Sequence, residues 1–261
     1  MKPNQPANRR HGAFTVIELM VVIGIIAVLA ALLFPVLSKA KKKSQGVWCE
    51  NNLRQLQLAW HLYADDSEGK LVRNQDRGTT TNRTWAAGWL NNTKSTPDNT
   101  NEIKIMHALL GSYSKTVKIY RCPGDKSVDK GNHLPRVRSV SMNAYMNGYG
   151  MGINTNYFNY RTMAEIDAPS DRWVFIDERE DSVNDCYFRV GLEEEVVRDF
   201  PASYHNWAGA LSFADGHMEI HKWKTPNITK PIQGSGDITS SEPALGNEDM
   251  KWLQQRTSSA R

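Results

Sequence analysis

The first apolar segment of the chain is long enough to cross a membrane. No charged side chain occurs over the 19 positions of residues 19–37, and about 20 apolar residues, rising about 1.5 Å each in a helix, span the hydrocarbon core of a bilayer. A cleaved secretory signal has a shorter apolar region of about 7–15 residues. We therefore predict a transmembrane helix over residues 14–37. A cleaved signal, with Ser38-Lys39-Ala40 as its cleavage site, is the alternative.

The helical pattern continues beyond this apolar segment. Apolar residues recur every third or fourth position, at Cys49, Leu53, Leu56, Trp60 and Tyr63. This spacing places them on one face of a helix. Acidic residues and a glycine replace the pattern over residues 65–69, so the helix is expected to end there. An unbroken helix over residues 14–65 would be about 78 Å long. We predict an amphipathic continuation over residues 38–66 that packs against a soluble head.

Residues 67–223 have the pattern of an α+β head. A short helix capped by Asn101 is predicted over residues 101–110. Five apolar runs then predict strands, at residues 117–120, 137–142, 173–176, 208–213 and 218–223. Asp215-Gly216 joins the last two runs and favours a tight hairpin. A long helix followed by an antiparallel sheet gives the α+β class. Residues 224–261 are predicted to form an irregular tail containing one short helix.

Charge and cysteine content exclude several functions. The chain has 32 basic and 28 acidic residues and a net charge of only +4, so it lacks the one-signed surface of a nucleic-acid-binding protein. We expect no nucleic-acid partner. Cys49, Cys122 and Cys186 are too few and too widely spaced to predict a disulfide scaffold or a zinc cluster. An oxidising compartment would still allow a single bond between Cys122 and Cys186.

An acidic segment near the middle of the head suggests a calcium site. Six oxygen-bearing side chains occur within nine residues, at Asp177, Glu178, Glu180, Asp181, Asn184 and Asp185. Calcium takes six to eight oxygen ligands from flexible loops. We predict Asp177, Asp181 and Asp185 as ligands, which makes calcium the candidate cofactor. A solvated acidic turn between two strands is the alternative.

The residue types of a hydrolase are present without the local motif of one. Ser203, His205 and Asp215 would make a triad, but no nucleophile elbow surrounds the serine. His217 and His221 are spaced to share one face of a strand, and we interpret them as structural. We expect that the protein is not an enzyme and assign no catalytic residue.

The N-terminus carries a family motif. Residues 12–19, Gly-Ala-Phe-Thr-Val-Ile-Glu-Leu, resemble the start of type IV pilins and type II secretion pseudopilins. In that family a prepilin peptidase cuts before a Phe, methylates the new amine and leaves Glu at mature position five. The resemblance implies cleavage between Ala13 and Phe14, removal of the basic leader 1–13, and methylation of Phe14. The family usually has Gly where this chain has Ala13, and a cut after Gly12 would leave Glu18 at position six.

Glu18 is unusual for a membrane helix. An ionised carboxylate at the centre of a membrane helix costs about 2.5–3.5 kcal/mol on insertion scales, so such residues usually have a partner. We therefore predict a role for Glu18 in assembly. The alternative is that its carboxylate reaches the membrane interface and has no partner.

A second resemblance lies in the head. His205, followed by nine residues and then Asp215-Gly216, resembles a C-terminal signature of a large group of bacterial pilin-like proteins. Residues 122–125, 141–143, 176–178 and 213–217 also look like segments of that group. This likeness assigns no role to His205.

Together the two resemblances imply a pilin-like, or pseudopilin, structural subunit of a type II secretion or type IV pilus-like filament. The implied partners are a prepilin peptidase, other pilin-like subunits and an inner-membrane assembly platform. The chain would cross the inner membrane once, with its head in the periplasm or another extracytoplasmic space. The alternative is a single-copy, membrane-anchored binding module that uses the helix only for export and retention.

Overall fold

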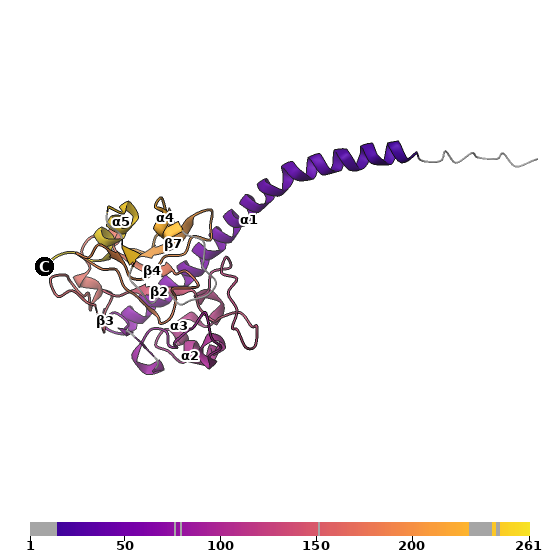
Figure 1. Ribbon diagram of the computed structural model, residues 1–261. Coiled ribbons are helices and arrows are strands. Elements are labelled where there is room, and N and C mark those ends of the chain that lie inside the picture. Colours follow the sequence, from indigo (N-terminus) through magenta and orange to yellow (C-terminus); the bar gives the residue numbers. More distant parts are fainter. Residues whose placement is uncertain (1–14, 76, 79, 151, 230–241, 244–245) are drawn as a thin grey trace, which may run out of the picture. The chain divides into compact units, whose positions relative to one another are not determined.

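The structure is a computed structural model that describes residues 15–75, 77–78, 80–150, 152–229, 242–243 and 246–261. It forms two compact units, Met1–Lys41 and Lys42–Arg261. Helix α1 (Val16–Asp66) contributes to both units, and the second unit, here called the head, contains every strand described (Figure 1). A long N-terminal helix followed by a sheet-containing head confirms the predicted α+β, pilin-like architecture.

Helix α1 follows the predicted apolar periodicity. Its helical backbone continues past Pro35. Within the head it buries one face, which includes Cys49, Leu53, Leu56 and Trp60. The helix ends at Asp66, after which Glu68 and Gly69 take positive φ angles of 58° and 79°. The Gly69 amide donates to the Ala64 carbonyl at 2.8 Å, so a left-handed cap satisfies the last turn and confirms the predicted end.

The central sheet of the head has five strands in the order β5-β2-β4-β7-β8. They are β2 (Val140–Asn143), β4 (Trp173–Asp177), β5 (Tyr187–Phe188), β7 (Ala208–Phe213) and β8 (Met218–Lys222). All pairs are antiparallel except β2 with β5, which is parallel. The sheet is therefore mixed, and the prediction of a wholly antiparallel sheet was wrong at β5. Two smaller sheets pair β1 (Asn74–Gln75) with β3 (Gly148–Tyr149) and β6 (Val196–Val197) with β9 (Glu242–Pro243).

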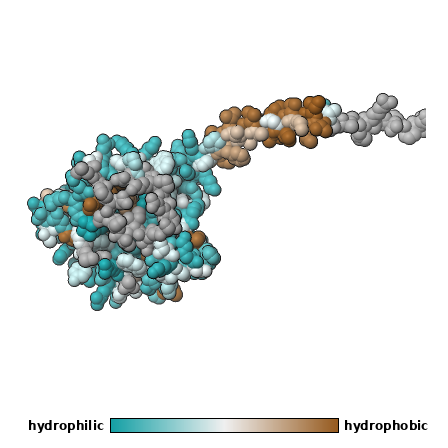
Figure 2. All heavy atoms as spheres, viewed as in Figure 1, coloured by the Kyte–Doolittle hydropathy of each residue, from teal (hydrophilic) through white to brown (hydrophobic). Residues whose placement is uncertain are grey.

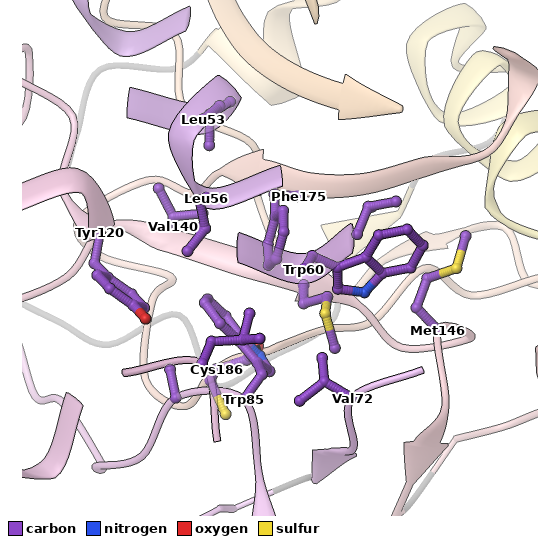
Figure 3. Close-up of a cluster of buried hydrophobic side chains, with 14 of the residues drawn as sticks. Leu53, Leu56, Trp60, Val72, Trp85, Tyr120, Val140, Met146, Phe175 and Cys186 are labelled. Atoms are coloured by element: carbon purple, nitrogen blue, oxygen red, sulfur yellow. Dashed lines mark hydrogen bonds between the residues drawn. The ribbon is translucent and has the colours of Figure 1, made fainter. Parts of the chain in front are cut away.

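Two hydrophobic clusters fill the head. In the first, Leu53, Leu56 and Trp60 of α1 pack with Val140 and Phe175 of the sheet (Figure 3). The second contains Leu211 and Phe213 of β7, whose side chains strand alternation places on the opposite face of the sheet from Ala210 of the first cluster. Met250 and Leu253 of helix α5 (Glu248–Thr257) also belong to this cluster. The C-terminal helix therefore belongs to the core of the head. This helix lies where one short helix was predicted within residues 224–261, but it packs into the core. Residues 230–241 and 244–245 of the predicted tail lie outside the described residues.

The connecting segments differ more from the sequence predictions. Asn101 caps a helix as expected, but α2 (Glu102–Met106) is short and a second helix, α3 (Gly111–Ser114), follows. Residues 117–120 form a 3-10 helix, Val117–Tyr120, and not a strand. The Thr116 hydroxyl accepts a hydrogen bond from the Lys118 amide at 3.3 Å and starts this turn. The remaining short helices are Thr81–Arg83, Pro97–Thr100, Met163–Glu165, Pro169–Asp171 and α4 (Pro226–Thr229).

Candidate functional site

The start of helix α1 brings Thr15 and Glu18 together. The Thr15 amide donates to Glu18 Oε2 at 2.9 Å, and the Glu18 amide donates to Thr15 Oγ1 at 3.2 Å. These reciprocal bonds form a capping box, which satisfies amides that have no partner inside the helix. The Thr15 hydroxyl also donates to Glu18 Oε2 at 2.8 Å. The predicted cleavage residues Ala13 and Phe14 lie outside the described residues.

The apolar half of α1 is exposed among the described residues. Among the described residues, α1 is the one helix long and apolar enough to cross a membrane. Its most apolar 18-residue window has a mean hydropathy of 3.0 and none of that window is buried. Figure 2 shows this segment as a continuous hydrophobic surface. A surface of this size requires lipid or other apolar partners, which is consistent with a single-pass membrane anchor.

A second candidate site is a cluster of four buried side chains in the head. Cys49 comes from α1, Cys122 follows the 3-10 helix Val117–Tyr120, Asp177 ends β4, and His205 precedes β7. One ligand atom from each residue lies within 4.8 Å of the others. Among the described residues, this is the only group of three or more His, Cys, Asp or Glu close enough to hold a metal ion together.

The protonation of this cluster is governed by burial. Burial raises the pKa of Asp177 to about 7 and the pKa of Cys122 well above its usual value. A hydrogen bond with Cys122 lowers the pKa of Cys49, but burial and the Asp177 charge outweigh it and raise the value to about 11. Burial lowers the pKa of His205, which the Lys42 backbone partly offsets. These surroundings favour neutral groups unless a positive charge is brought among them.

Comparison with known protein families identifies the N-terminal segment. Residues 8–34 match the prokaryotic N-terminal methylation motif. The chain carries a prepilin-type N-terminus. This supports a type IV pilin-like protein that a prepilin peptidase processes and that assembles with other pilin-like subunits. Searches of the curated proteins and of the solved structures found no match. The C-terminal signature is not shown by these comparisons and stays a prediction.

The residues of that C-terminal signature lie at two separate places. Gly216 has a φ of 97° and forms the turn of the β7–β8 hairpin, as predicted. Asp215 accepts from the His217 amide at 3.0 Å and pairs with His217 Nδ1 at 2.6 Å. His205 instead contacts Cys122 and Asp177. Asp215 therefore pairs with a different histidine from the one in the candidate hydrolase triad.

The three predicted calcium ligands have three different environments. Asp177 accepts from the Ser139 hydroxyl at 2.8 Å, and Asp181 pairs with Arg179 at 2.5 Å. Asp185 accepts backbone amides from Arg77 and Tyr187 at 2.7 and 3.0 Å. Among the described residues these three carboxylates do not form a group spaced to hold one ion, so the calcium site stays a prediction.

The cysteines are also arranged differently from the prediction. All three are buried free thiols, and Cys186 lies near Thr84, at 3.2 Å from its hydroxyl. The Cys122–Cys186 bond that an oxidising compartment would allow is therefore not formed in this structure. Sequence spacing had also argued against a zinc cluster, and so missed Cys49 and Cys122. The sequence did contain one sign of this cluster. Cys122, Asp177 and His205 each lie in a segment that resembles the C-terminal group, and Cys49 lies on the predicted apolar face of α1.

Proposed function

We propose that the protein is a pilin-like structural subunit of a type II secretion or type IV pilus-like filament. This proposal rests on the prepilin-type motif at residues 8–34, which lies at the start of a solvent-exposed apolar helix. The subunit waits in the inner membrane with its head in the extracytoplasmic space. On assembly, the apolar helices of neighbouring subunits replace lipid as the cover of this surface. The head acts as a structural part and not as an enzyme.

The processing step has a direct test. We expect cleavage between Ala13 and Phe14 and methylation of the new amine at Phe14, because this register puts Glu18 at the fifth position of the mature chain. Intact-mass measurement of the protein from its native membrane measures both changes. A mature chain that begins at Lys41, or one that keeps Met1, would contradict processing by a prepilin peptidase.

The Glu18 carboxylate is proposed to set the axial position of each incoming subunit. The capping box holds this carboxylate beside Thr15, one residue from the amine that cleavage at Phe14 would create. The positive amine of an incoming subunit attracts the Glu18 carboxylate of a subunit already in place, and lipid solvates neither charge well. This attraction selects one offset between neighbouring helices.

Two substitutions separate the charge of Glu18 from its capping role. Glu18→Ala removes both, whereas Glu18→Gln keeps an oxygen that accepts from Thr15 and removes the charge. Both variants should enter the membrane and be cleaved, while crosslinked oligomers and filaments should be lost. Glu68→Ala, at an exposed acid of the head, serves as the control. Wild-type levels of crosslinked oligomer in Glu18→Ala would overturn the proposal and favour a single-copy anchored module.

A further inference from the structure

We propose that Cys49, Cys122, Asp177 and His205 bind one zinc ion inside the head. This is a metal site in addition to the filament role, and it does not depend on that role. The four residues are far apart in sequence, since 128 residues separate Cys49 from Asp177 and 83 separate Cys122 from His205. Folding nevertheless brings their ligand atoms into one buried cluster.

The spacing of the ligand atoms suits a tetrahedral ion. Cys122 Sγ lies 3.2 Å from His205 Nε2, and Cys49 Sγ lies 3.7 Å from Asp177 Oδ2. His205 Nε2 and Asp177 Oδ2 are 4.0 Å apart. Zinc bonds of about 2.0–2.3 Å place the corners of a tetrahedron about 3.3–3.8 Å apart. Small side-chain movements would therefore be enough to seat the ion.

The chemistry of the ligands selects zinc among the common divalent ions. Thiolate and imidazole ligands suit zinc, whereas calcium and magnesium prefer sets of oxygen ligands. Two thiolates and the Asp177 carboxylate bring three negative charges to the ion, and binding releases to solvent the two thiol protons and any proton held by Asp177. Four protein ligands close the coordination shell, as in structural zinc sites.

The residues around the cluster support each ligand. The Ser139 hydroxyl donates to Asp177 Oδ1 at 2.8 Å and leaves Oδ2 directed at the cluster. The Gly124 amide donates to Cys122 Sγ at 3.3 Å, a bond that stabilises a thiolate. His205 Nδ1 is buried without a partner in hydrogen-bond geometry. The Lys42 backbone lies close enough to affect this ring, so metal binding at Nε2 would leave a proton on Nδ1 directed at the main chain.

Gly124 is required for this arrangement. A Cβ atom at this position would lie 2.6 Å from Tyr204 Cβ and 3.2 Å from His205 Cε1. The turn after Cys122 can therefore approach His205 closely only without a side chain. The same turn borders a surface groove of about 720 Å³ that Cys122 and Pro123 help to line, and we expect the ion to enter from this side.

A disulfide between Cys49 and Cys122 would use the same thiols but would not use the rest of the cluster. It would leave the Asp177 carboxylate and the His205 ring buried beside an uncharged bond, and both thiols are free in the structure. A zinc ion binds all four groups at once. It fastens helix α1 to the ends of β4 and β7 and to the Cys122 turn, and so acts as a structural clamp.

Metal analysis of the full chain tests this proposal. The protein is purified in mild detergent without chelator, exchanged against zinc, and freed of loosely bound metal on a desalting column. We expect about one zinc per chain, lost in Cys122→Ser and in His205→Ala. Cys186→Ser is the matched control, because it removes a buried thiol outside the cluster and should keep its zinc. Retention of zinc in Cys122→Ser would overturn the assignment.

Measurements on the unmutated chain keep the test independent of variant folding. Replacing zinc with cobalt should give the visible bands of tetrahedral cobalt and a thiolate-to-cobalt charge-transfer band. Strong chelation should lower the thermal unfolding midpoint by about 10 °C, and added zinc should restore it. Less than about a tenth of a zinc per chain after exchange would overturn the proposal. So would a Cys49–Cys122 disulfide in the protein isolated from its native membrane, detected by non-reducing peptide mapping.

Discussion

Replacing Asn143 with alanine should strongly destabilise the head. Its amide nitrogen donates to the Trp173 and Thr257 carbonyls, both at 2.9 Å, and its Oδ1 accepts from the Tyr145 amide at 2.9 Å. Asn143 has no exposed surface. These bonds join β2 to the start of β4 and to the last turn of α5. Asn143 therefore holds together three segments that are distant in sequence.

The size of the effect follows from the groups left behind. Asn143→Ala leaves two buried carbonyl oxygens and one buried amide without these partners, and an unsatisfied buried group costs about 1–3 kcal/mol. The carbonyls keep a second lone pair and cost least, so we expect a loss of about 3 kcal/mol. With a urea dependence near the upper end of the usual range of about 1–3 kcal/mol per molar, the unfolding midpoint should fall by about 1 M.

Tryptophan fluorescence of the full chain in detergent measures this midpoint, since Trp173 and Trp60 are fully buried in the head. Asn51→Ala is the matched control, because Asn51 is exposed on α1 and alanine has the higher helix propensity. It should shift stability by less than about 0.5 kcal/mol. A change this small in Asn143→Ala, or an equal loss in the control, would refute the reasoning.

Two further substitutions test the packing and the electrostatics of the head. A Cβ atom on Gly148 would lie 1.7 Å from the Ala144 carbonyl oxygen, so Gly148→Ala should lower the free energy of unfolding, measured in urea, by about 1–3 kcal/mol. Gly24→Ala is the control, because no atom lies within 4 Å of the new Cβ, and it should leave the urea unfolding transition of the head unchanged. A hydrogen bond from Arg172 lowers the pKa of Asp167 from 3.8 to about 2, so its ionised form stabilises the fold above pH 3.8 and this stability is lost as pH falls towards 2. Because the Asp167 side chain is 47% exposed, solvent screening limits the expected loss of unfolding free energy in Asp167→Asn to about 1 kcal/mol at pH 7. If the unfolding free energies of variant and parent fell equally between pH 4 and pH 2, this interpretation would be contradicted.

Local signals in the sequence were enough to predict the helix and the central strands. The spacing of Leu53, Leu56 and Trp60 indicated the buried face of α1, and the apolar runs at residues 173–176 and 208–213 became β4 and β7. These elements are long or strongly patterned. The four-residue run at 117–120 was ambiguous because short apolar runs do not separate strands from helical turns. There the Thr116 cap, which is a local hydrogen bond, selected the 3-10 helix.

The proposed zinc site could not be predicted from local sequence patterns. Motifs for zinc depend on paired ligands at short spacing, and here each ligand comes from a different segment. The acidic run beginning at Asp177 predicts calcium only if neighbours in sequence are also neighbours in space. Asp177 is the last residue of a buried strand, so its side chain enters the core, while Asp181 and Asp185 lie in the turn that follows. Tertiary contacts alone could reveal its partners.

The spacing of the predicted C-terminal signature has a structural explanation, because its two halves lie at different places in the head. His205 and Asp215 lie on either side of β7, Ala208–Phe213, and six residues of extended chain cover about 20 Å. The two side chains therefore belong to opposite ends of one strand. Between His205 and β7, Asn206 and Trp207 take positive φ angles of 58° and 66°, and the His205 amide donates to the Ala208 carbonyl at 3.1 Å.

In this geometry the nine-residue spacing between His205 and Asp215 corresponds to the length of β7. Gly216 sets the hairpin turn and hence the register of β7 with β8, in which Ser212 faces Met218 and Ala208 faces Lys222. With that end fixed, one residue more or less in the strand would carry His205 away from Cys122 and Asp177, because successive side chains alternate between faces of a sheet. A single alanine inserted within β7 should therefore abolish zinc binding. The same insertion within residues 80–83, on an exposed segment away from the cluster, should leave it intact.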